Sequence, residues 1–385
     1  MSDDPRAATN PLFNRNKLKL GVFAFNGNGA YMTKIPEQFD PTWPNTLDVA
    51  QQADQAGWEA LVPYARWRAF VAPEHRSGTV FDCYTWAAAV GALTSYSCVL
   101  STVHVPIIHP IVGAKMGTTI DHVSGGRFGM NIVCGWFSEE IKMFGAKPLD
   151  HDDRYAYADE WLTCMKRLWS EPGGFDFHGK YFQIANGMSQ PKPLQKPFPA
   201  LMNAGGSGAG RRFVAKHCDM AFVPAITDDE NYLREQVKAY RKLAWDENRR
   251  EIEVWSAVYA VHRDTYEEAV KFVDYYAEEH GDDEYADYFL AEQTAGQTIP
   301  PAMLKAMRRS FKAGYSGIGL LGPGDRITDQ LVRLSNCGLD GVLFVWVDFQ
   351  EGIRRFNREV LPLLEQAGLR EPFRRPATAP GASTR

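Results

Sequence analysis

The sequence predicts an α/β protein built as a TIM (β/α)8 barrel, with insertions after the fourth strand and between the seventh and eighth strands. Short runs rich in Val, Ile, Leu and Phe alternate with helical patterns over almost the whole chain, which is typical of βα units and a parallel sheet. These runs are apolar nearly throughout, as expected for strands covered on both faces. Eight strand and helix pairs can be counted, and eight such pairs close a barrel.

The first half of the chain supplies four of these units. We predict strands over 19–25, 59–65, 99–105 and 128–134. We predict the helices that follow them over 45–56, 83–94, 111–123 and 155–169. The last of these helices has the apolar spacing of an amphipathic helix that packs on a sheet.

The second half supplies the other four units and both insertions. Strands are predicted over 200–203, 220–223, 254–261 and 341–347, and helices from Ser207 and over 230–245, 266–279 and 353–366. The first insertion, 173–199, is rich in Gly and Pro and contains an aromatic β pattern over 175–182. The second, 281–324, is predicted to be helical and partly acidic. Long excursions from a compact domain usually serve function, so we expect lids or substrate-selecting segments there.

The composition excludes several classes of protein. The 385 residues are 45% hydrophobic and 23% charged, and the net charge of -5 gives no basic field for nucleic acid. No apolar run reaches the roughly 20 residues of a membrane helix, and the N-terminus lacks the pattern of a signal peptide. We therefore expect a cytoplasmic protein with an N-terminal arm over 1–16, one barrel domain over 17–372 and a disordered tail over 373–385.

Neither the cysteines nor the histidines form a metal-binding pattern. The six cysteines have no CxxC spacing, so we expect free thiols. His104, His109 and His122 suggest a metal-dependent hydrolase at first sight, but acidic ligands at matching strand ends are missing. We predict no metal, and we keep His104 as a candidate that orients a substrate from the end of a strand.

The most informative stretch is 125–136, GGRFGMNIVCGW, where Asn131 interrupts an apolar strand. A buried amide without a partner costs about 1–3 kcal/mol, so Asn131 must bind backbone, water or a ligand. Thr102 lies in the middle of the preceding strand, and adjacent barrel strands would place the two side chains next to each other. Residues at the carboxyl ends of barrel strands are often catalytic. Trp136, just beyond the strand, offers a flat wall for an aromatic ligand.

A glycine-rich segment, 203–212, follows a strand and opens a helix. Its backbone N–H groups, the helix N-terminus and the hydroxyl of Ser207 suit a phosphate group, and Arg154 could add a second contact. The glycines do not match the GxGxxG register of a dinucleotide fold. A flexible turn is the alternative interpretation.

Together these residues resemble the bacterial luciferase-like, flavin-dependent monooxygenases. The resemblance extends from about 19 to 366 and is strongest at 120–136, Glu140, 144–145, 154–155 and 204–207. Within that superfamily the chain is similar to the branch of the pyrimidine, dimethylsulfone and alkanesulfonate monooxygenases.

The resemblance implies a set of site residues. Flavin contacts fall on Tyr64, Ala65, Asn131, Glu140, Arg154, Tyr155 and Ser207. Thr102 and Asn131 match residues beside the oxygen-binding pocket of the pyrimidine oxygenase, in which oxygen adds to the central-ring nitrogen of the flavin. His104 departs from that enzyme, which has a small residue at this position. His104 and the segments 67–78 and 175–190 therefore leave the substrate open.

The implied activity is that of a two-component monooxygenase. It would use reduced flavin mononucleotide (FMN) and O2, through a flavin peroxide, to oxygenate a sulfone, sulfonate, N-heterocycle or haloaromatic compound. No NAD(P)H fingerprint is present, so a separate NAD(P)H-dependent flavin reductase is the expected partner, and a homodimer or homotetramer the expected assembly. A deazaflavin-dependent dehydrogenase of the same superfamily and a non-catalytic flavin-binding barrel are the alternatives.

Overall fold

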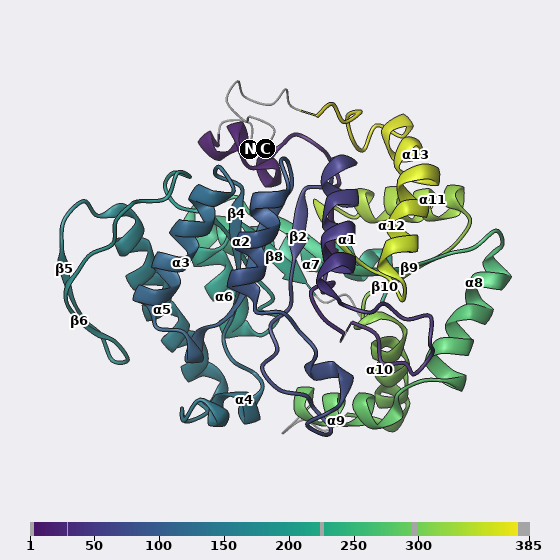
Figure 1. Ribbon diagram of the computed structural model, residues 1–385, viewed down its shortest axis with the longest axis horizontal. Coiled ribbons are helices and arrows are strands. Elements are labelled where there is room, and N and C mark those ends of the chain that lie inside the picture. The colour runs from purple at the N-terminus through teal and green to yellow at the C-terminus, as the bar shows by residue number, and fades with distance from the viewer. Residues whose placement is uncertain (1–3, 29, 224–226, 295–298, 376–385) are drawn as a thin grey trace.

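The structure is a computed structural model that describes residues 4–28, 30–223, 227–294 and 299–375. Eight parallel strands close into a barrel, because β9 pairs with β8 and with β11, and β11 pairs with β1 (Figure 1). In barrel order the strands are β1 Lys19–Phe23, β2 Ala60–Val62, β3 Cys98–His104, β4 Phe128–Val133, β7 Ala200–Asn203, β8 Met220–Val223, β9 Glu253–His262 and β11 Gly341–Val345. The predicted barrel and its eight strands are confirmed.

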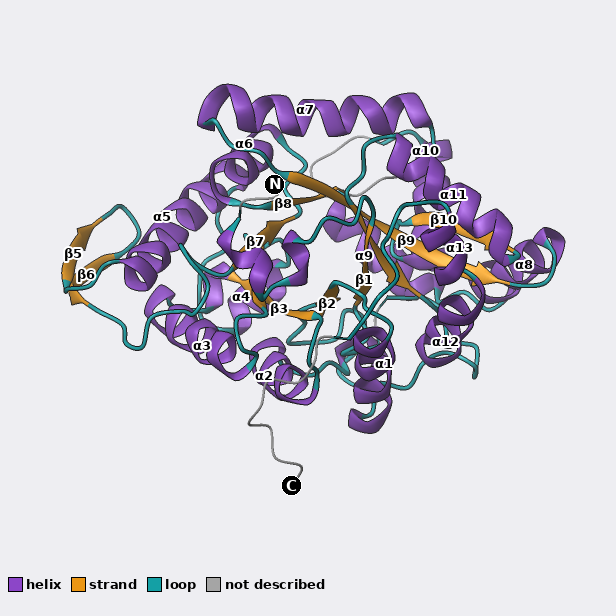
Figure 2. Ribbon diagram, turned by 90° about the horizontal axis from the view of Figure 1, so that it is seen from above, coloured by secondary structure: helices purple, strands orange, loops and turns teal. Residues whose placement is uncertain are grey.

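Helices surround the barrel, as Figure 2 shows from above. Those that follow barrel strands are α1 Trp43–Gln55, α2 Cys83–Leu93, α3 Pro110–Val123, α4 Ser138–Met143, α5 His151–Ser170, α6 Gly208–His217, α7 Glu230–Asn248, α8 Tyr266–Val273, α12 Phe349–Glu359 and α13 Leu361–Gln366. Side-chain caps fix where several of them begin: Asp82 caps α2, Ser207 caps α6, and Thr265 forms a capping box with Glu268 on α8. The predicted helix over 266–279 changes to a π-helix at Asp274–Glu279.

The first insertion is an antiparallel hairpin of β5 Phe175–His178 and β6 Gln183–Gly187, which projects from the barrel beside α5 (Figures 1 and 2). The carboxylate of Glu160 on α5 accepts hydrogen bonds from the backbone N–H groups of residues 180, 181 and 182. The aromatic β pattern at 175–182 therefore does form a hairpin, and Glu160 of α5 attaches it.

The second insertion contains α9 Asp283–Gln293 and α10 Pro301–Gly314, followed by a strand, β10 Ile318–Gly322, and by α11 Gly324–Asn336. The helical segments predicted within 281–324 are present, but the strand β10 was not predicted. Val258 and Tyr259 of β9 pair with β11 on one side and with β10 on the other, so β10 lies on the same edge of β9 as β8. β10 extends the sheet beyond the short β8.

Both ends of the described chain close the amino-terminal end of the barrel. Arg6 of the N-terminal arm pairs with Asp219 at the start of β8, with 3.0 Å between Nη2 and Oδ1. Glu59, just before β2, accepts hydrogen bonds from Asn14 and Asn16 of the arm and from Arg370 near the other end. Phe373, the first residue of the predicted tail, packs on the ring of Tyr96 at 4.5 Å between centroids. The rest of that tail, from residue 376, lies outside the described residues.

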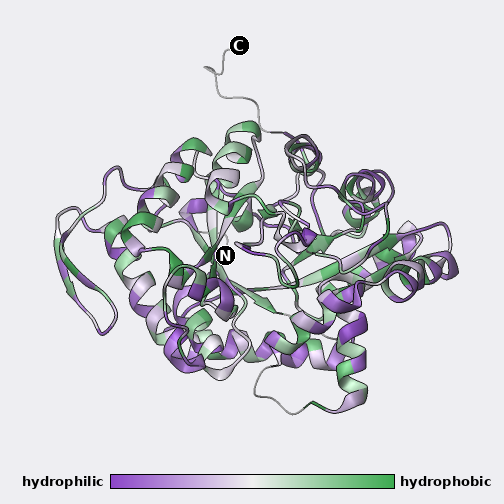
Figure 3. Ribbon diagram, turned by 60° about the horizontal axis from the view of Figure 1, so that its bottom comes forward, coloured by the Kyte–Doolittle hydropathy of each residue, from purple (hydrophilic) through white to green (hydrophobic). Residues whose placement is uncertain are grey.

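The main core fills the barrel and the layer between strands and helices, and Figure 3 shows the barrel strands in the colours of apolar residues. A second apolar cluster, here called the mouth cluster, joins one face of α9 to residues from other parts of the chain. It consists of Met32, Phe70, Phe137, Tyr285, Ala286 and Phe289. No helix in the described part of the chain is both long and apolar enough to cross a membrane. All six cysteines are buried free thiols.

Candidate active site

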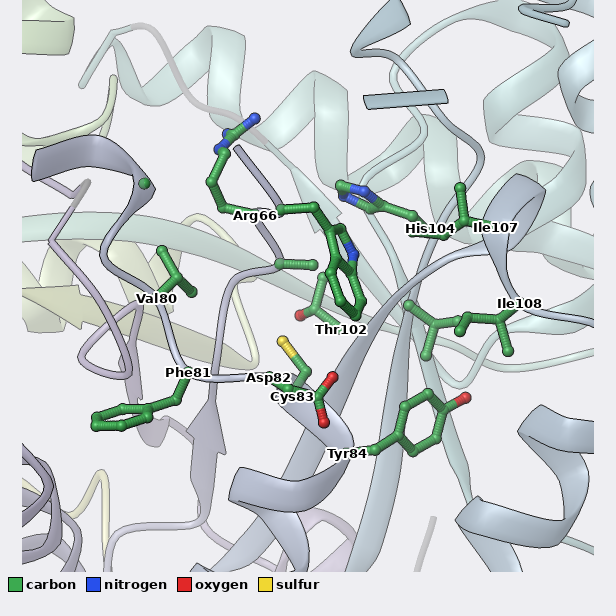
Figure 4. A pocket seen from close by; sticks show the side chains of 14 residues that line it. Arg66, Val80, Phe81, Asp82, Cys83, Tyr84, Thr102, His104, Ile107 and Ile108 are labelled. Atoms are coloured by element: carbon green, nitrogen blue, oxygen red, sulfur yellow. The ribbon is translucent and has the colours of Figure 1, made fainter. Parts of the chain in front are cut away.

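A cavity of about 190 Å³ opens at the carboxyl ends of β2 and β3. Its walls come from the loop after β2, the end of β3 and the start of α2, and Figure 4 shows Thr102 near its centre. Arg66, Asp82, Thr102 and His104 are among the residues that line it. Catalytic sites of TIM barrels lie at this end, so the cavity is the candidate active site.

Thr102 and Asn131 form a hydrogen-bonded pair on neighbouring strands. They are register partners in β3 and β4, and the Asn131 Nδ2 donates to Thr102 Oγ1 at 3.2 Å. Thr102 Oγ1 in turn donates to the carbonyl oxygen of Pro63. The predicted neighbourhood of these two side chains is confirmed.

This chain of hydrogen bonds leaves a specific part of Asn131 free for a ligand. Its Oδ1 atom is buried and has no hydrogen-bond partner among the residues that the structure describes. The Thr102 proton is committed to Pro63, so the second Nδ2 proton and the Oδ1 atom of Asn131 are the groups that can meet a ligand. The amide predicted from the sequence therefore has the open hydrogen-bonding capacity of a binding group.

His104 and Glu140 are in buried polar contact beside this site. His104 Nδ1 lies 3.0 Å from Glu140 Oε2, and the backbone N–H of Trp67 donates to Glu140 Oε1 at 2.7 Å. Burial raises the pKa of the Glu140 carboxyl, but the contacts with His104, Arg66 and the Trp67 amide outweigh it and hold that pKa below its usual value. Glu140 thus connects α4 to the loop after β2 through its Oε1 atom, while its Oε2 atom accepts no hydrogen bond from the described residues.

Arg66 is the site residue that the sequence analysis missed. Its side chain is only 2% exposed, and its Nη1 lies 3.6 Å from Glu140 Oε1, too far for a hydrogen bond. The guanidinium carbon lies 3.9 Å from the ring centroid of Phe70, with Trp136 and Phe137 also close. A single arginine in a loop carries no sequence signal, so only the fold reveals its burial. Trp136 packs against the mouth cluster, and its role as a wall for an aromatic ligand stays a prediction.

Ser207 and Tyr155 meet at the N-terminus of α6. Ser207 Oγ accepts from the backbone N–H of Gly210 at 3.1 Å, and the Tyr155 hydroxyl lies within hydrogen-bonding reach of Ser207. Glycine is required at 210, because a side chain there would come within 2.6 Å of the Tyr155 hydroxyl. Burial raises the pKa of Tyr155, so this hydroxyl remains a donor. Arg154 precedes Tyr155 on α5, and its Nε donates to the carbonyl of Leu149, which fixes the side chain.

Tyr64 and Ala65 lie in the loop after β2, where Ala65 lines the cavity. Asn26, after β1, fixes Tyr64 through two reciprocal bonds of 3.0 Å to its backbone N–H and carbonyl. The Tyr64 hydroxyl is buried and has no hydrogen-bond partner within the described residues. The described part of the chain also has no cluster of three or more His, Cys, Asp or Glu placed to hold a metal.

The comparisons with known proteins fit this arrangement. Residues 18–341 match the family model of the luciferase-like monooxygenases. The chain belongs to this family. It is 28% identical over 365 residues to the pyrimidine monooxygenase RutA of Bradyrhizobium sp., covering 92% of this chain and 99% of that protein. It is also 28% identical over 359 residues to the FMNH2-dependent dimethylsulfone monooxygenase of Pseudomonas putida, covering 91% and 95%.

Solved structures share the fold. The riboflavin lyase RcaE, solved with a modified FMN and riboflavin, superposes with a TM-score of 0.81 at 24% identity and covers 92% of this chain and 93% of its own. The EDTA monooxygenase of Chelativorans sp. BNC1 has a TM-score of 0.80 at 20% identity, with coverage of 92% and 95%. These neighbours confirm the barrel, while the family model identifies the chain as a luciferase-like monooxygenase.

Proposed function

We propose that the protein is a two-component monooxygenase that receives reduced FMN from a separate NAD(P)H-dependent reductase and uses O2 to oxygenate a small organic substrate. Family membership and the similarity to an FMNH2-dependent relative over nearly the whole chain support this proposal. The substrate classes carried over from the resemblance are sulfones, sulfonates, N-heterocycles and haloaromatics.

The observation that carries the proposal is the unsatisfied amide oxygen of Asn131, which is buried and whose amide nitrogen bonds Thr102, a residue that lines the cavity. A buried polar atom without a partner implies a ligand or water. The second fit is at α6, where a helix N-terminus, Ser207 and Tyr155 offer donors of the kind that bind a phosphate. The residues therefore suit a flavin mononucleotide, with Arg154 as a further candidate for its phosphate.

Reduced FMN, when bound, supplies the electrons that activate O2. The protein's own residues bind, orient and exclude water. Thr102 holds the amide of Asn131 in one orientation, because it accepts from Nδ2 while its own proton goes to Pro63. The free Nδ2 proton then stabilises negative charge that develops on oxygen, in the way of an oxyanion site. His104 and Glu140 keep the neighbouring wall polar and fixed, and apolar residues of the mouth cluster shield the site from water.

The test is incorporation of isotope-labelled oxygen from O2 into a panel of sulfones, sulfonates, N-heterocycles and haloaromatics, with a purified NADH-dependent FMN reductase as the source of reduced flavin. We expect at least one labelled product, and its loss in Asn131→Leu, which keeps the side-chain volume but removes the amide. The control is Asn45→Leu at the exposed start of α1. Asn203→Leu is unsuitable as a control, because Asn203 donates a hydrogen bond to the backbone of β4. Absence of product from the whole panel would contradict the proposal.

Cofactor binding distinguishes the proposal from its alternatives. A solved F420-dependent secondary alcohol dehydrogenase shares this fold with a TM-score of 0.66 at 16% identity. Tighter binding of a deazaflavin than of FMN in a fluorescence titration would favour a dehydrogenase. Flavin binding that survives Asn131→Leu, with no oxygenated product from the unaltered protein, would favour a non-catalytic flavin-binding barrel.

A further inference from the structure

Arg66 is a buried cation whose hydrogen-bonding capacity is largely unused. Its Nε and Nη1 atoms are buried and make no hydrogen bond to any residue that the structure describes. A guanidinium has five N–H donors in a fixed plane, and its burial without acceptors is costly. Arg66 is one of the residues that line the candidate active site, together with Thr102 and His104.

The surroundings of Arg66 position the guanidinium without satisfying it. Phe70 packs against one face at 3.9 Å, and Trp136 and Phe137 lie at 5.2 and 5.3 Å. Glu140 offsets the charge, but its Oε1 accepts from Trp67 N at 2.7 Å and its Oε2 faces His104 at 3.0 Å. Arg66 Nη1 lies 3.6 Å from Glu140 Oε1, so Glu140 neutralises the charge without accepting a hydrogen bond from the guanidinium, and the Nε and Nη1 donors keep no partner among the described residues.

Arg66 and Asp82 lie at different ends of the cavity. Figure 4 shows Arg66 at one end and Asp82 at the other, with Thr102 between them. Asp82 Oδ1 is the N-cap of α2 and accepts from the backbone N–H and the hydroxyl of Thr85. The carboxylate of Asp82 repels a negative group on a ligand, whereas Arg66, whose charge Glu140 offsets, provides unpartnered N–H donors at the other end.

We propose that Arg66 binds an oxyanion group of the substrate, a carboxylate or sulfonate, and so makes this enzyme selective for organic anions. The proposal rests on the proposed monooxygenase function. The planar fork of a guanidinium forms two parallel hydrogen bonds to such a group, which lysine cannot reproduce. The hydroxyl of Tyr64, two residues away along the loop, is also buried without a hydrogen-bond partner among the described residues. Burial raises the pKa of Tyr64 well above its usual value, so the hydroxyl keeps its proton.

The test measures binding, with and without oxidised FMN, for matched pairs of an anion and its neutral analogue. Methanesulfonate with dimethylsulfone, benzenesulfonate with methyl phenyl sulfone, and benzoate with benzamide differ chiefly in charge. Isothermal titration is carried out on the unaltered protein, Arg66→Met and Arg66→Lys. Arg68→Met is the matched control, because Arg68 lies in the same loop but is 42% exposed and pairs with Glu139.

We expect at least one anion to bind more tightly than its neutral analogue, and Arg66→Met to weaken that anion by about tenfold or more, as expected for a charged hydrogen bond. Arg66→Lys should recover only part of this affinity, and Arg68→Met should change nothing. Circular dichroism and urea unfolding establish that each variant is folded. Equal affinity for both members of every pair, or an Arg66→Met variant with unaltered anion affinity, would overturn the proposal.

The flavin phosphate is the other oxyanion that Arg66 could meet, and riboflavin separates the two cases. If Arg66→Met weakened FMN but not riboflavin, and left the organic anions unaffected, the guanidinium would serve the cofactor and the proposal would be wrong. These binding experiments do not depend on turnover. A failure to oxygenate any compound would therefore overturn the proposed function while leaving the anion result to be judged by itself.

Discussion

Replacing Thr102 by Val tests the central pair of the site. Valine keeps the β-branched shape in β3 but removes the hydroxyl that donates to Pro63 O and accepts from Asn131 Nδ2. Both Thr102 and Asn131 are buried, with exposed fractions of 6% and 5%. Two buried hydrogen bonds are lost, at a net cost of about 1 kcal/mol each, and the partners left behind add a desolvation penalty. We therefore expect the free energy of unfolding to fall by about 2–3 kcal/mol.

The effect on catalysis should exceed this loss of stability. Without Thr102 the Asn131 amide can turn, so its Nδ2 proton no longer points in a fixed direction. Loss of one donor from an oxyanion site typically reduces kcat by about 10²-fold, and we expect a decrease of that order in Thr102→Val. Thr102→Ser keeps both hydrogen bonds and should retain most of the activity.

The assay is steady-state product formation with reductase-supplied FMN, combined with a fluorescence titration of oxidised FMN and urea unfolding. We expect the affinity for FMN to change little, because the phosphate contacts assigned to Ser207 and Tyr155 lie at α6. Unchanged kcat in Thr102→Val would refute the reasoning. So would a fall in FMN affinity that accounts for the whole loss of activity.

Three further experiments have defined outcomes. Ser207→Ala should weaken FMN by about tenfold, as expected for one charged hydrogen bond, but leave riboflavin binding unchanged in the same fluorescence titration; equal weakening of both flavins would argue against a phosphate contact. Glu140→Gln should destabilise the protein at neutral pH. Because the pKa of Glu140 in the folded protein lies below the unfolded value of about 4.3, the difference in free energy of unfolding between the unaltered protein and the variant should shrink as the pH falls through the folded pKa. Urea unfolding across a pH series measures this, and a difference independent of pH would count against the His104–Glu140 pair. The six cysteines should react with a thiol reagent only after denaturation, because all are buried and burial raises the pKa of Cys164 and Cys218 to about 12; fast labelling of the native protein would contradict this.

The strands of the barrel could be predicted because a buried parallel strand is a continuous apolar run. Asn131 stood out within such a run, and adjacency of β3 and β4 followed from chain order, so its pairing with Thr102 could be predicted as well. The strand β10 was missed because its sequence, IGLLG, is short, carries two glycines and follows a long helical segment. Its pairing depends on the length of β9, which no local pattern reveals.

The loop residues of the site were harder to predict. Glu140 was expected to orient the flavin, and its engagement with His104 and Trp67 N emerges only when α4 folds against the loop after β2. Arg66 carries no pattern at all, because its burial depends on three aromatic rings that come from other parts of the chain as well as from its own loop. Sequence periodicity reports on faces of strands and helices, whereas these contacts depend on how loops cross above the barrel. The roles of the predicted flavin contacts, the reductase partner and the oligomer stay predictions.

The buried carboxylate of Glu59 has a consequence for how the chain is made. It binds Asn14 and Asn16 near the beginning of the chain and Arg370, a residue 311 positions further along, with 2.7 Å between Arg370 Nη1 and Glu59 Oε2. During synthesis, the early strands leave the ribosome long before Arg370 exists. Folding before that point would bury the Glu59 carboxylate without a cation beside it, and Glu59 would bind only Asn14 and Asn16 of the arm. The final closure of the barrel therefore waits for the last segment to be translated, and nascent chains that stop short of residue 370 should be the ones that chaperones and proteases recognise.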